Sequence, residues 1–180
     1  MPDVPILAGP RLTLRAPRDA DAAARLALGR DADVLRGFGL RAADLPPLDA
    51  AACDAWLAEQ RAARAWMIEV GGALAGTVRL HTHIPEDARA QVAIGMLSSH
   101  FMGHGYGCEA LALVFDHAFY QMGLHRIGLR VLATNMRAHR AYLSLGFVEE
   151  GRERQSARTA DGWEDDIVMG LLASDWRSAA

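Results

Sequence analysis

Cysteine is scarce in this chain of 180 residues. The two cysteines, Cys53 and Cys108, stand far apart, and neither has a partner at the short spacing of metal-binding cysteine pairs. The sequence therefore excludes a disulfide framework and a cysteine-rich metal centre, and we expect no metal cofactor. So few cysteines are typical of a protein kept in a reducing compartment.

Long apolar runs and an excess of positive charge are also absent. No segment is long and apolar enough to cross a membrane. The opening Met1-Pro2-Asp3-Val4-Pro5 lacks the basic and apolar regions of a secretory leader. The formal net charge is −3, which does not favour nonspecific nucleic-acid binding. We expect a cytoplasmic protein with neither a membrane nor a nucleic acid as partner.

A glycine-rich stretch is the most informative part of the chain. Residues 101–110 read Phe-Met-Gly-His-Gly-Tyr-Gly-Cys-Glu-Ala, between an apolar segment and a helix-periodic one. This order predicts a strand, a glycine turn and a helix. Glycine lets a ligand approach the backbone, and a helix N-terminus offers unpaired N–H groups with a partial positive charge. The stretch suits a phosphate or pyrophosphate; a tight turn without a ligand is the alternative.

The same stretch lacks the features of two common nucleotide loops. No Lys-Ser/Thr pair ends it, as a Walker-type site requires. The later glycine of the dinucleotide fingerprint is missing too, and the surrounding strand-helix pairs are sparse. A nucleotide-binding module is therefore disfavoured.

The remaining patterns predict one mixed α+β domain over residues 1–180. Apolar alternation and β-propensity predict seven strands, at 11–16, 65–70, 73–84, 89–97, 125–133, 147–154 and 165–172. Helical spacing predicts helices that start at Asp19 or Asp21 and end near Arg30, and others over 49–64, 111–122 and 135–145. Segment 38–47, with two glycines nearby and two prolines, is predicted to be a loop.

Two stretches together resemble the signatures of the GNAT superfamily, the acyl-CoA-dependent N-acetyltransferases. Residues 101–110 resemble its pyrophosphate loop, and residues 135–147, Asn-Met-Arg-Ala-His-Arg-Ala-Tyr-Leu-Ser-Leu-Gly-Phe, resemble its second signature. Arg11-Leu12-Thr13-Leu14-Arg15, Glu149-Glu150-Gly151 and segment 165–172 look like the ribosomal-protein-alanine (RimJ/RimL-type) and diamine N-acetyltransferase branch. The resemblance implies a central, mostly antiparallel twisted sheet of six to seven strands with helices on both faces.

The activity that the resemblance implies is direct transfer of an acetyl group from acetyl-CoA, as co-substrate, to a primary amine in a ternary complex. The backbone of Met102, Gly103, His104, Gly105, Tyr106 and Gly107 is then expected to hold the pyrophosphate. Met96 and Leu97 are expected to offer main-chain partners to the pantetheine arm, with a plain core role as the alternative. The family usually has Arg or Gln where Met102 stands, so we expect weaker binding, partly compensated by His104.

Three residues of the second signature receive roles by resemblance. Tyr142 is expected to be the general acid, since a phenol with a pKa near 10 can protonate a departing thiolate; core packing is its alternative. Asn135 is expected to hydrogen-bond the pantetheine, to cap the helix, or both. Arg140 is expected to reach the CoA phosphates, and Arg137 to lie on a solvated face.

The base and the acceptor stay open at this point. The strand before the turn, Gln91-Val92-Ala93-Ile94-Gly95, lacks the glutamate found in parts of the family. His81, His83 and Glu69 are candidate bases, each with a structural role as the alternative, and a chain of water molecules could serve instead.

The amine acceptor could be a protein N-terminus or a small molecule. Candidate pocket residues are Phe38, Leu40, Trp56 and segment 163–166. A non-catalytic acyl-CoA-binding or regulatory domain is the competing function; Met102 and the missing carboxylate favour it, and Tyr142 argues against it. The oligomeric state stays open; a homodimer is common in the branch that the chain resembles.

Overall fold

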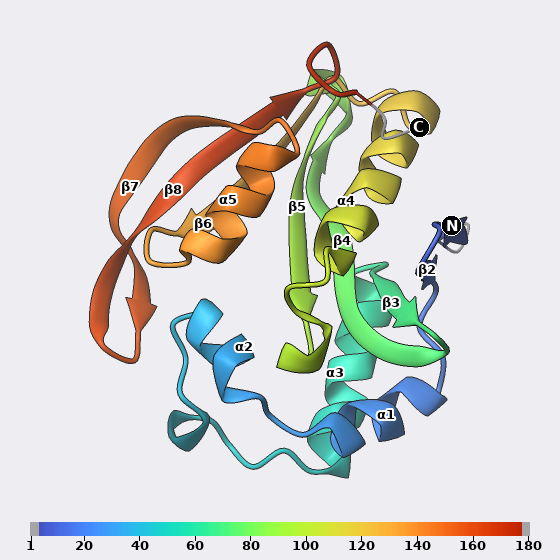
Figure 1. Cartoon of the computed structure of the whole chain (residues 1–180), viewed down its shortest axis with the longest axis vertical. Helices are drawn as coiled ribbons and strands as arrows, with labels where there is room; N and C mark the ends of the chain where they lie inside the picture. Colours follow the sequence, from blue (N-terminus) through green and yellow to red (C-terminus); the bar gives the residue numbers. More distant parts are fainter. Residues whose placement is uncertain (1–3, 178–180) are drawn as a thin grey trace.

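Eight strands form one sheet in the computed structural model, which describes residues 4–177 (Figure 1). They are β1 (Leu7–Ala8), β2 (Thr13–Arg15), β3 (Trp66–Val70), β4 (Ala73–Ile84), β5 (Arg89–Met96), β6 (Arg126–Leu132), β7 (Val148–Thr159) and β8 (Gly162–Leu172). Their order across the sheet is β1-β2-β3-β4-β5-β6-β8-β7. Neighbouring strands are antiparallel, except that β5 and β6 are parallel. Residues 1–3 and 178–180, the ends of the predicted domain, lie outside the described residues.

The predicted α+β class and mostly antiparallel sheet are confirmed, but the strand number is corrected from six or seven to eight. The added strand, β1, has two residues and is too short to show an alternating pattern. The hairpin of β7 and β8 is longer than predicted, with Thr159 paired to Gly162 across its turn. Nearly every side chain of β7 is exposed, so its sequence lacks the apolar alternation that marks a half-buried strand.

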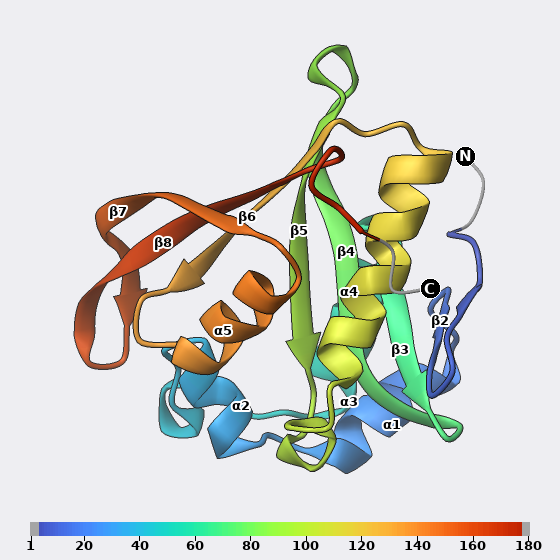
Figure 2. The same cartoon turned by 45° about the horizontal axis from the view of Figure 1, so that its top comes forward.

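Five α-helices cover the sheet, with α4 in front of it and α3 behind it in Figure 2. Their bounds are α1 (Ala20–Leu28), α2 (Ala32–Gly37), α3 (Ala50–Ala62), α4 (Tyr106–Asp116) and α5 (Met136–Ser144). Single 3-10 turns occupy Ala42–Asp44, Pro85–Asp87 and Ser99–Phe101, and a π-helical turn, His117–Gln121, extends α4. None of the helices in residues 4–177 combines the length and apolar character needed to cross a membrane.

Two helices differ from the sequence prediction. α4 begins at Tyr106, before the predicted start at residue 111, because a left-handed glycine ends the turn at Gly105 and the helix runs through Gly107 despite the low helix propensity of glycine. α2 was not predicted: it has six residues, fewer than periodicity can reveal, and depends on its N-cap. The Asp31 side chain caps it by accepting from the N–H groups of Asp33 and Val34 at 3.0 and 3.3 Å.

The apolar stripe of α4 forms the centre of the core. Leu111, Val114 and Phe115 are fully buried against the sheet, and the Phe115 ring packs edge-on against Trp176 at 5.3 Å. Met122, the last residue of the helix predicted over 111–122, does not continue this stripe and is exposed. The π-helical turn before it changes the phase of the helix and rotates this side chain away from the sheet.

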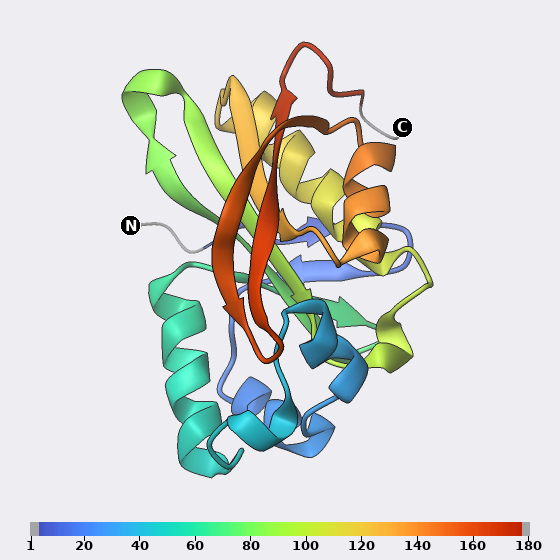
Figure 3. The ribbon, with the colours of Figure 1, turned by 90° about the vertical axis from the view of Figure 1, so that its left-hand side faces the viewer.

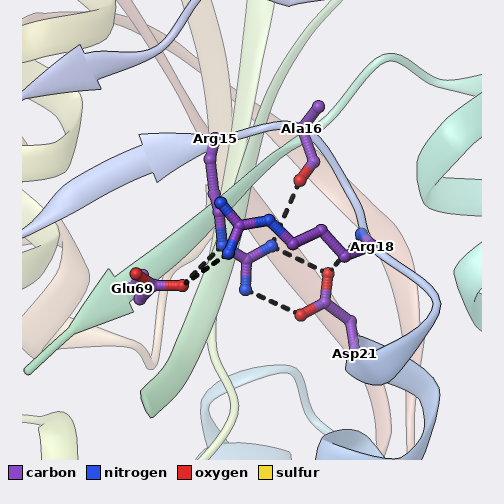
Figure 4. A network of polar contacts seen from close by, with 5 residues as sticks. All are labelled: Arg15, Ala16, Arg18, Asp21 and Glu69. Carbon is purple, nitrogen blue, oxygen red and sulfur yellow. Dashed lines mark hydrogen bonds and ion pairs between the residues drawn. The ribbon is translucent and has the colours of Figure 1, made fainter. Parts of the chain in front are cut away.

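A buried arginine joins β2, β3 and α1 (Figure 4). Arg15 donates from Nη1 and Nη2 to the two carboxylate oxygens of Asp21 at 2.9 and 2.8 Å, and from Nε to Glu69 at 2.5 Å. Asp21 also accepts from the N–H of Arg18 at 2.7 Å. α1 begins directly after Asp19, one of the two predicted start positions, but the Asp19 side chain makes no capping hydrogen bond and Asp21 is bound to Arg15 instead.

The sheet opens between β5 and β6. These strands pair only where Arg89–Gln91 meets Arg126–Gly128, although β5 stays paired with β4 as far as Met96. The two strands then diverge, and Figures 1 and 2 show α5 and α2 near their open ends. Figure 3 shows the β7–β8 hairpin passing above α2. The opening leaves the edge of β5 facing β6 without a strand partner beyond Gln91.

Candidate functional site

The glycine turn leaves a row of backbone N–H groups without an acceptor. Gly103 and Gly105 adopt left-handed φ angles of 80° and 81°, and Gly105 is the N-cap of α4. The Glu109 N–H is the first of the helix to find an acceptor, the Gly105 carbonyl at 3.0 Å. Among residues 4–177, no group accepts from the N–H groups of residues 103–108. Together with the helix dipole they make an anion site.

A cavity of about 270 Å³ adjoins this row of N–H groups and is called the turn pocket below. Its walls come from the end of β5, the glycine turn with the first turn of α4, the end of α2, and α5. It brings together seven of the predicted cofactor residues: Met96, Met102, Gly103, Gly105, Tyr106, Gly107 and Asn135. Phe38, predicted as a pocket residue, also lines it.

Three predicted cofactor residues lie off the turn pocket. Leu97 donates its N–H to the Ala75 carbonyl at 2.9 Å, so this N–H is not free for a pantetheine arm. His104 is exposed, and its ring lies 5.7 Å from that of Tyr106. Arg140 is exposed and does not line the turn pocket.

Arg137 takes the place predicted for Arg140. It lines the turn pocket and an adjoining cavity of about 510 Å³ that also contains Met102 and Arg36. Arg36 is ion-paired with Asp33 at 3.0 Å, whereas no carboxylate in residues 4–177 pairs with Arg137. Arg137 is exposed, as expected, and it also lies in the wall of the two cavities beside the glycine turn.

Asn135 uses its side-chain amide within the protein. Its Oδ1 accepts from the Ala138 N–H at 3.2 Å, which confirms the predicted helix cap. Its Nδ2 donates to the Gly37 carbonyl at 2.8 Å and so ties α5 to the end of α2. A hydrogen bond from Asn135 to pantetheine stays a prediction, open to the second N–H of this amide.

Tyr142, on α5, does not itself line the turn pocket, but it lies close enough to Cys108 of the pocket wall to interact with it electrostatically. Its ring packs against Phe147 at 5.8 Å, and burial, with a contribution from Cys108, raises its pKa to about 12. The phenol is therefore protonated at neutral pH, and no group in residues 4–177 hydrogen-bonds it. Cys108 lines the pocket, and burial raises the pKa of its thiol, which does not favour a nucleophilic thiolate.

A second cavity, of about 610 Å³, lies across β4, β5, β6 and the β7–β8 hairpin and is called the sheet pocket below. It shares Gly37, Phe38, Ile94 and Asn135 with the turn pocket. Its polar side chains are His81, Thr82, Gln91, Arg130, Asn135, Glu153 and Asp166. The two pockets thus meet at the opening of the sheet, with Phe38 in the wall of both.

Residues 11–148 match the family model of the acetyltransferase (GNAT) domain. The chain belongs to the GNAT family. Probable N-acetyltransferase YjcK from Bacillus subtilis (strain 168) is 36% identical to it over 94 residues, 47% of this chain and 52% of that protein. The chain spans a little over half the length of the curated relatives it matches, 52% and 57%.

Solved structures of GNAT proteins share the fold. Spermidine N-acetyltransferase from Vibrio cholerae, in complex with CoA and spermine, aligns with a TM-score of 0.76 at 23% identity, over 93% of this chain and 98% of that one. Mycobacterium smegmatis RimJ, in complex with CoA-disulfide, aligns with a TM-score of 0.79 at 24% identity, over 95% and 87%. The predicted GNAT fold is confirmed.

The three candidate bases of this GNAT domain have different surroundings in the structure, and only one of them lines a pocket. Glu69 is held by Arg15 at 2.5 Å and lies near Arg18 at 3.7 Å, so it is committed to the ion-pair network in Figure 4. His83 lines neither pocket, whereas His81 lines the sheet pocket. Burial, and then Arg79 and Arg130, lower the pKa of His81, which favours its neutral form. His81 is therefore the candidate that the geometry retains.

Most of the other residues predicted to line the pocket for the amine acceptor lie outside both pockets. Trp56 packs against the small cluster of Ala22, Cys53 and Leu57. Leu40 and Trp163 are exposed and line neither pocket; Arg158 lies over the Trp163 ring at 5.4 Å. From segment 163–166 only Asp166 reaches the sheet pocket. In the described part of the chain, no group of three or more His, Cys, Asp or Glu side chains is arranged to hold a metal ion.

Proposed function

We propose that this GNAT domain transfers an acetyl group from acetyl-CoA to a primary amine, with the diphosphate of the cofactor at the glycine turn. The row of unpaired N–H groups at residues 103–108 carries the proposal, since it offers backbone donors and a helix dipole at one end of a largely apolar pocket. The free guanidinium of Arg137 would bind a further CoA phosphate in the adjoining cavity.

The opening of the sheet supports a route for the pantetheine arm. Beyond Gln91 the edge of β5 has unpaired main-chain groups facing β6, and an extended amide-containing arm can pair with such an edge. Met96 lies in the pocket wall at the end of this edge. The thioester would then lie near Ile94 and Phe38, where the two pockets meet, and an N–H of β5 would polarise its carbonyl.

We place the amine acceptor in the sheet pocket. Glu153 and Asp166 favour a cationic amine there, although Arg130 pairs with Glu153 at 2.7 Å and offsets one of these charges. Neutral His81, or water in the pocket, would take the proton that the ammonium must lose before it attacks. A small amine and a protein N-terminus both fit this chemistry, and we assign the chain to the RimJ/RimL-type branch as part of this proposal.

The proposed reaction balances without a covalent enzyme intermediate. The neutral amine nitrogen forms a bond to the thioester carbon and loses a second proton to water in the pocket, the carbon–sulfur bond breaks, and the sulfur leaves with the electron pair. Tyr142 donates its phenolic proton to that sulfur and regains one from solvent. Its pKa of about 12 keeps the proton in place before the reaction but makes the phenol a weaker acid than a free one.

A thiol-release assay separates this enzyme from a non-catalytic acyl-CoA-binding domain. Purified chain is mixed with acetyl-CoA and a panel of polyamines, amino sugars and peptides with free N-termini, and free CoA is measured. We expect amine-dependent release for at least one class. Calorimetric binding of acetyl-CoA without amine-dependent release from any panel member would favour the binding domain instead.

A further inference from the structure

We propose that Arg11, which comes before β2, is a positioning residue that holds the glycine turn in its ligand-binding shape. The proposal rests on the proposed function, because it concerns the loop assigned to the diphosphate. Arg11 lines neither the turn pocket nor the sheet pocket. It acts on the cofactor through the backbone of the turn, as the following contacts indicate.

Arg11 connects the turn to the first turn of α4. Its Nη1 donates to the His104 carbonyl at 2.8 Å. Its Nε donates to one Glu109 carboxylate oxygen at 2.6 Å, and its own backbone N–H donates to the other at 2.9 Å. One residue thus holds a carbonyl in the middle of the turn and a side chain of the helix that follows, on either side of Gly105.

The guanidinium also packs against the turn. It lies over the Tyr106 ring, with Cζ 5.2 Å from the ring centroid. A Cβ on Gly105 would lie 3.3 Å from Arg11 Nη2, so the left-handed Gly105 rests closely against the same group. Gly103 and Gly105 would otherwise give this turn wide conformational freedom. Arg11 limits that freedom from the side away from the ligand.

Because the ion pair between Arg11 and Glu109 is exposed, we expect it to order the glycine turn more than it stabilises the whole fold. The Arg11 side chain is 51% exposed and that of Glu109 12%, and pairs with an exposed partner contribute little to folding. A loop that already has its bound conformation, however, loses less conformational entropy when the ligand binds, so binding is tighter. Loss of Arg11 is therefore expected to weaken binding of the diphosphate more than it lowers the melting temperature.

The test compares two acetyl donors. Acetyl-CoA carries the diphosphate, and S-acetylpantetheine carries the same thioester without it. Arg11→Met keeps the apolar part of the side chain and removes its hydrogen-bond donors. Arg11→Lys keeps the positive charge but lacks the several N–H donors of the guanidinium, and it replaces Arg11→Met in the test if that variant does not fold. Arg89→Met is the matched control, because Arg89 is about as exposed at 48% and is also ion-paired, with Asp87 at 3.0 Å.

For Arg11→Met we expect kcat/KM with acetyl-CoA to fall roughly tenfold, through KM, and kcat/KM with S-acetylpantetheine to stay at the wild-type value. Arg11→Lys should fall between Arg11→Met and wild type, and Arg89→Met should match wild type with both donors. An equal loss with both donors, or no loss with acetyl-CoA, would overturn the proposal. Failure of the wild-type chain to bind CoA in calorimetry would instead count against the proposed function.

Discussion

Asp31 and Ser99 join the start of α2 to the 3-10 turn Ser99–Phe101, which follows β5. Asp31 Oδ2 accepts from the Ser99 N–H at 2.6 Å, while Oδ1 caps α2. Hydrogen bonds from Ser99 are the largest cause that lowers the pKa of Asp31 to about 2, from an ordinary value of 3.8. One carboxylate therefore fixes the short helix that leads to Phe38, the residue in the wall of both pockets.

The ionisation of Asp31 gives a prediction on pH. A carboxyl whose folded pKa is depressed stabilises the fold above its unfolded pKa, and the contribution disappears as pH falls through the folded value. Asp31→Asn should therefore lower the melting temperature by a few degrees at neutral pH, and the difference from wild type should close between about pH 4 and pH 2. Melting curves across this range are the measurement; a difference that persists unchanged at pH 2 would exclude the ionic contribution.

Met102 provides a prediction on cofactor affinity. It lines the turn pocket and the adjoining cavity that contains Arg137, so an arginine at this position would face the same phosphates. Met102→Arg should tighten CoA binding by about 1 kcal/mol, roughly fivefold in Kd, as expected for one charge-assisted hydrogen bond. Arg137→Met should weaken it by a similar factor. Titration calorimetry checks both variants, and unchanged affinity in both would show that neither position faces the cofactor.

Tyr142 gives a prediction on the chemical step. Tyr142→Phe keeps the ring and its packing on Phe147 and removes the hydroxyl. If the phenol protonates the leaving sulfur, kcat should fall by roughly 10²-fold with little change in acetyl-CoA affinity. A tyrosine that serves only the core would leave kcat unaffected. Steady-state kinetics with any accepted amine, together with a melting curve, distinguish the two roles; full kcat in a folded variant would remove Tyr142 from the mechanism.

Local patterns accounted for the parts of the site that one segment builds. The glycine turn and the Asn135 cap each depend on neighbours in sequence, and the structure shows both. The bonds from Arg11 to Glu109 and from Asn135 to Gly37 join residues 98 positions apart, so no local pattern could indicate them.

The choice between Arg137 and Arg140 shows a second limit of prediction from the sequence alone. Both arginines follow the same cap, and the sequence does not give the direction in which α5 faces the cavity. Packing sets that direction: Arg137, Ala138 and Ala141 line the turn pocket, whereas Arg140 does not, although both arginines are exposed. A helix of nine residues offers too little periodicity to fix its phase in advance.

Binding of CoA to a Gly105→Val variant tests the central claim, that the glycine turn holds the diphosphate, most directly. A branched side chain at this left-handed glycine would strain the turn and press against Arg11, whose Nη2 would lie 3.3 Å from the added Cβ, and would so displace the N–H groups of the turn. Gly72→Val is the matched control, since Gly72 has a φ of 82°, nothing within 4 Å of an added Cβ, and a place in the β3–β4 hairpin. We predict that calorimetry detects CoA binding to wild type and Gly72→Val and none to a folded Gly105→Val protein. Wild-type affinity in folded Gly105→Val would contradict the assignment of this turn.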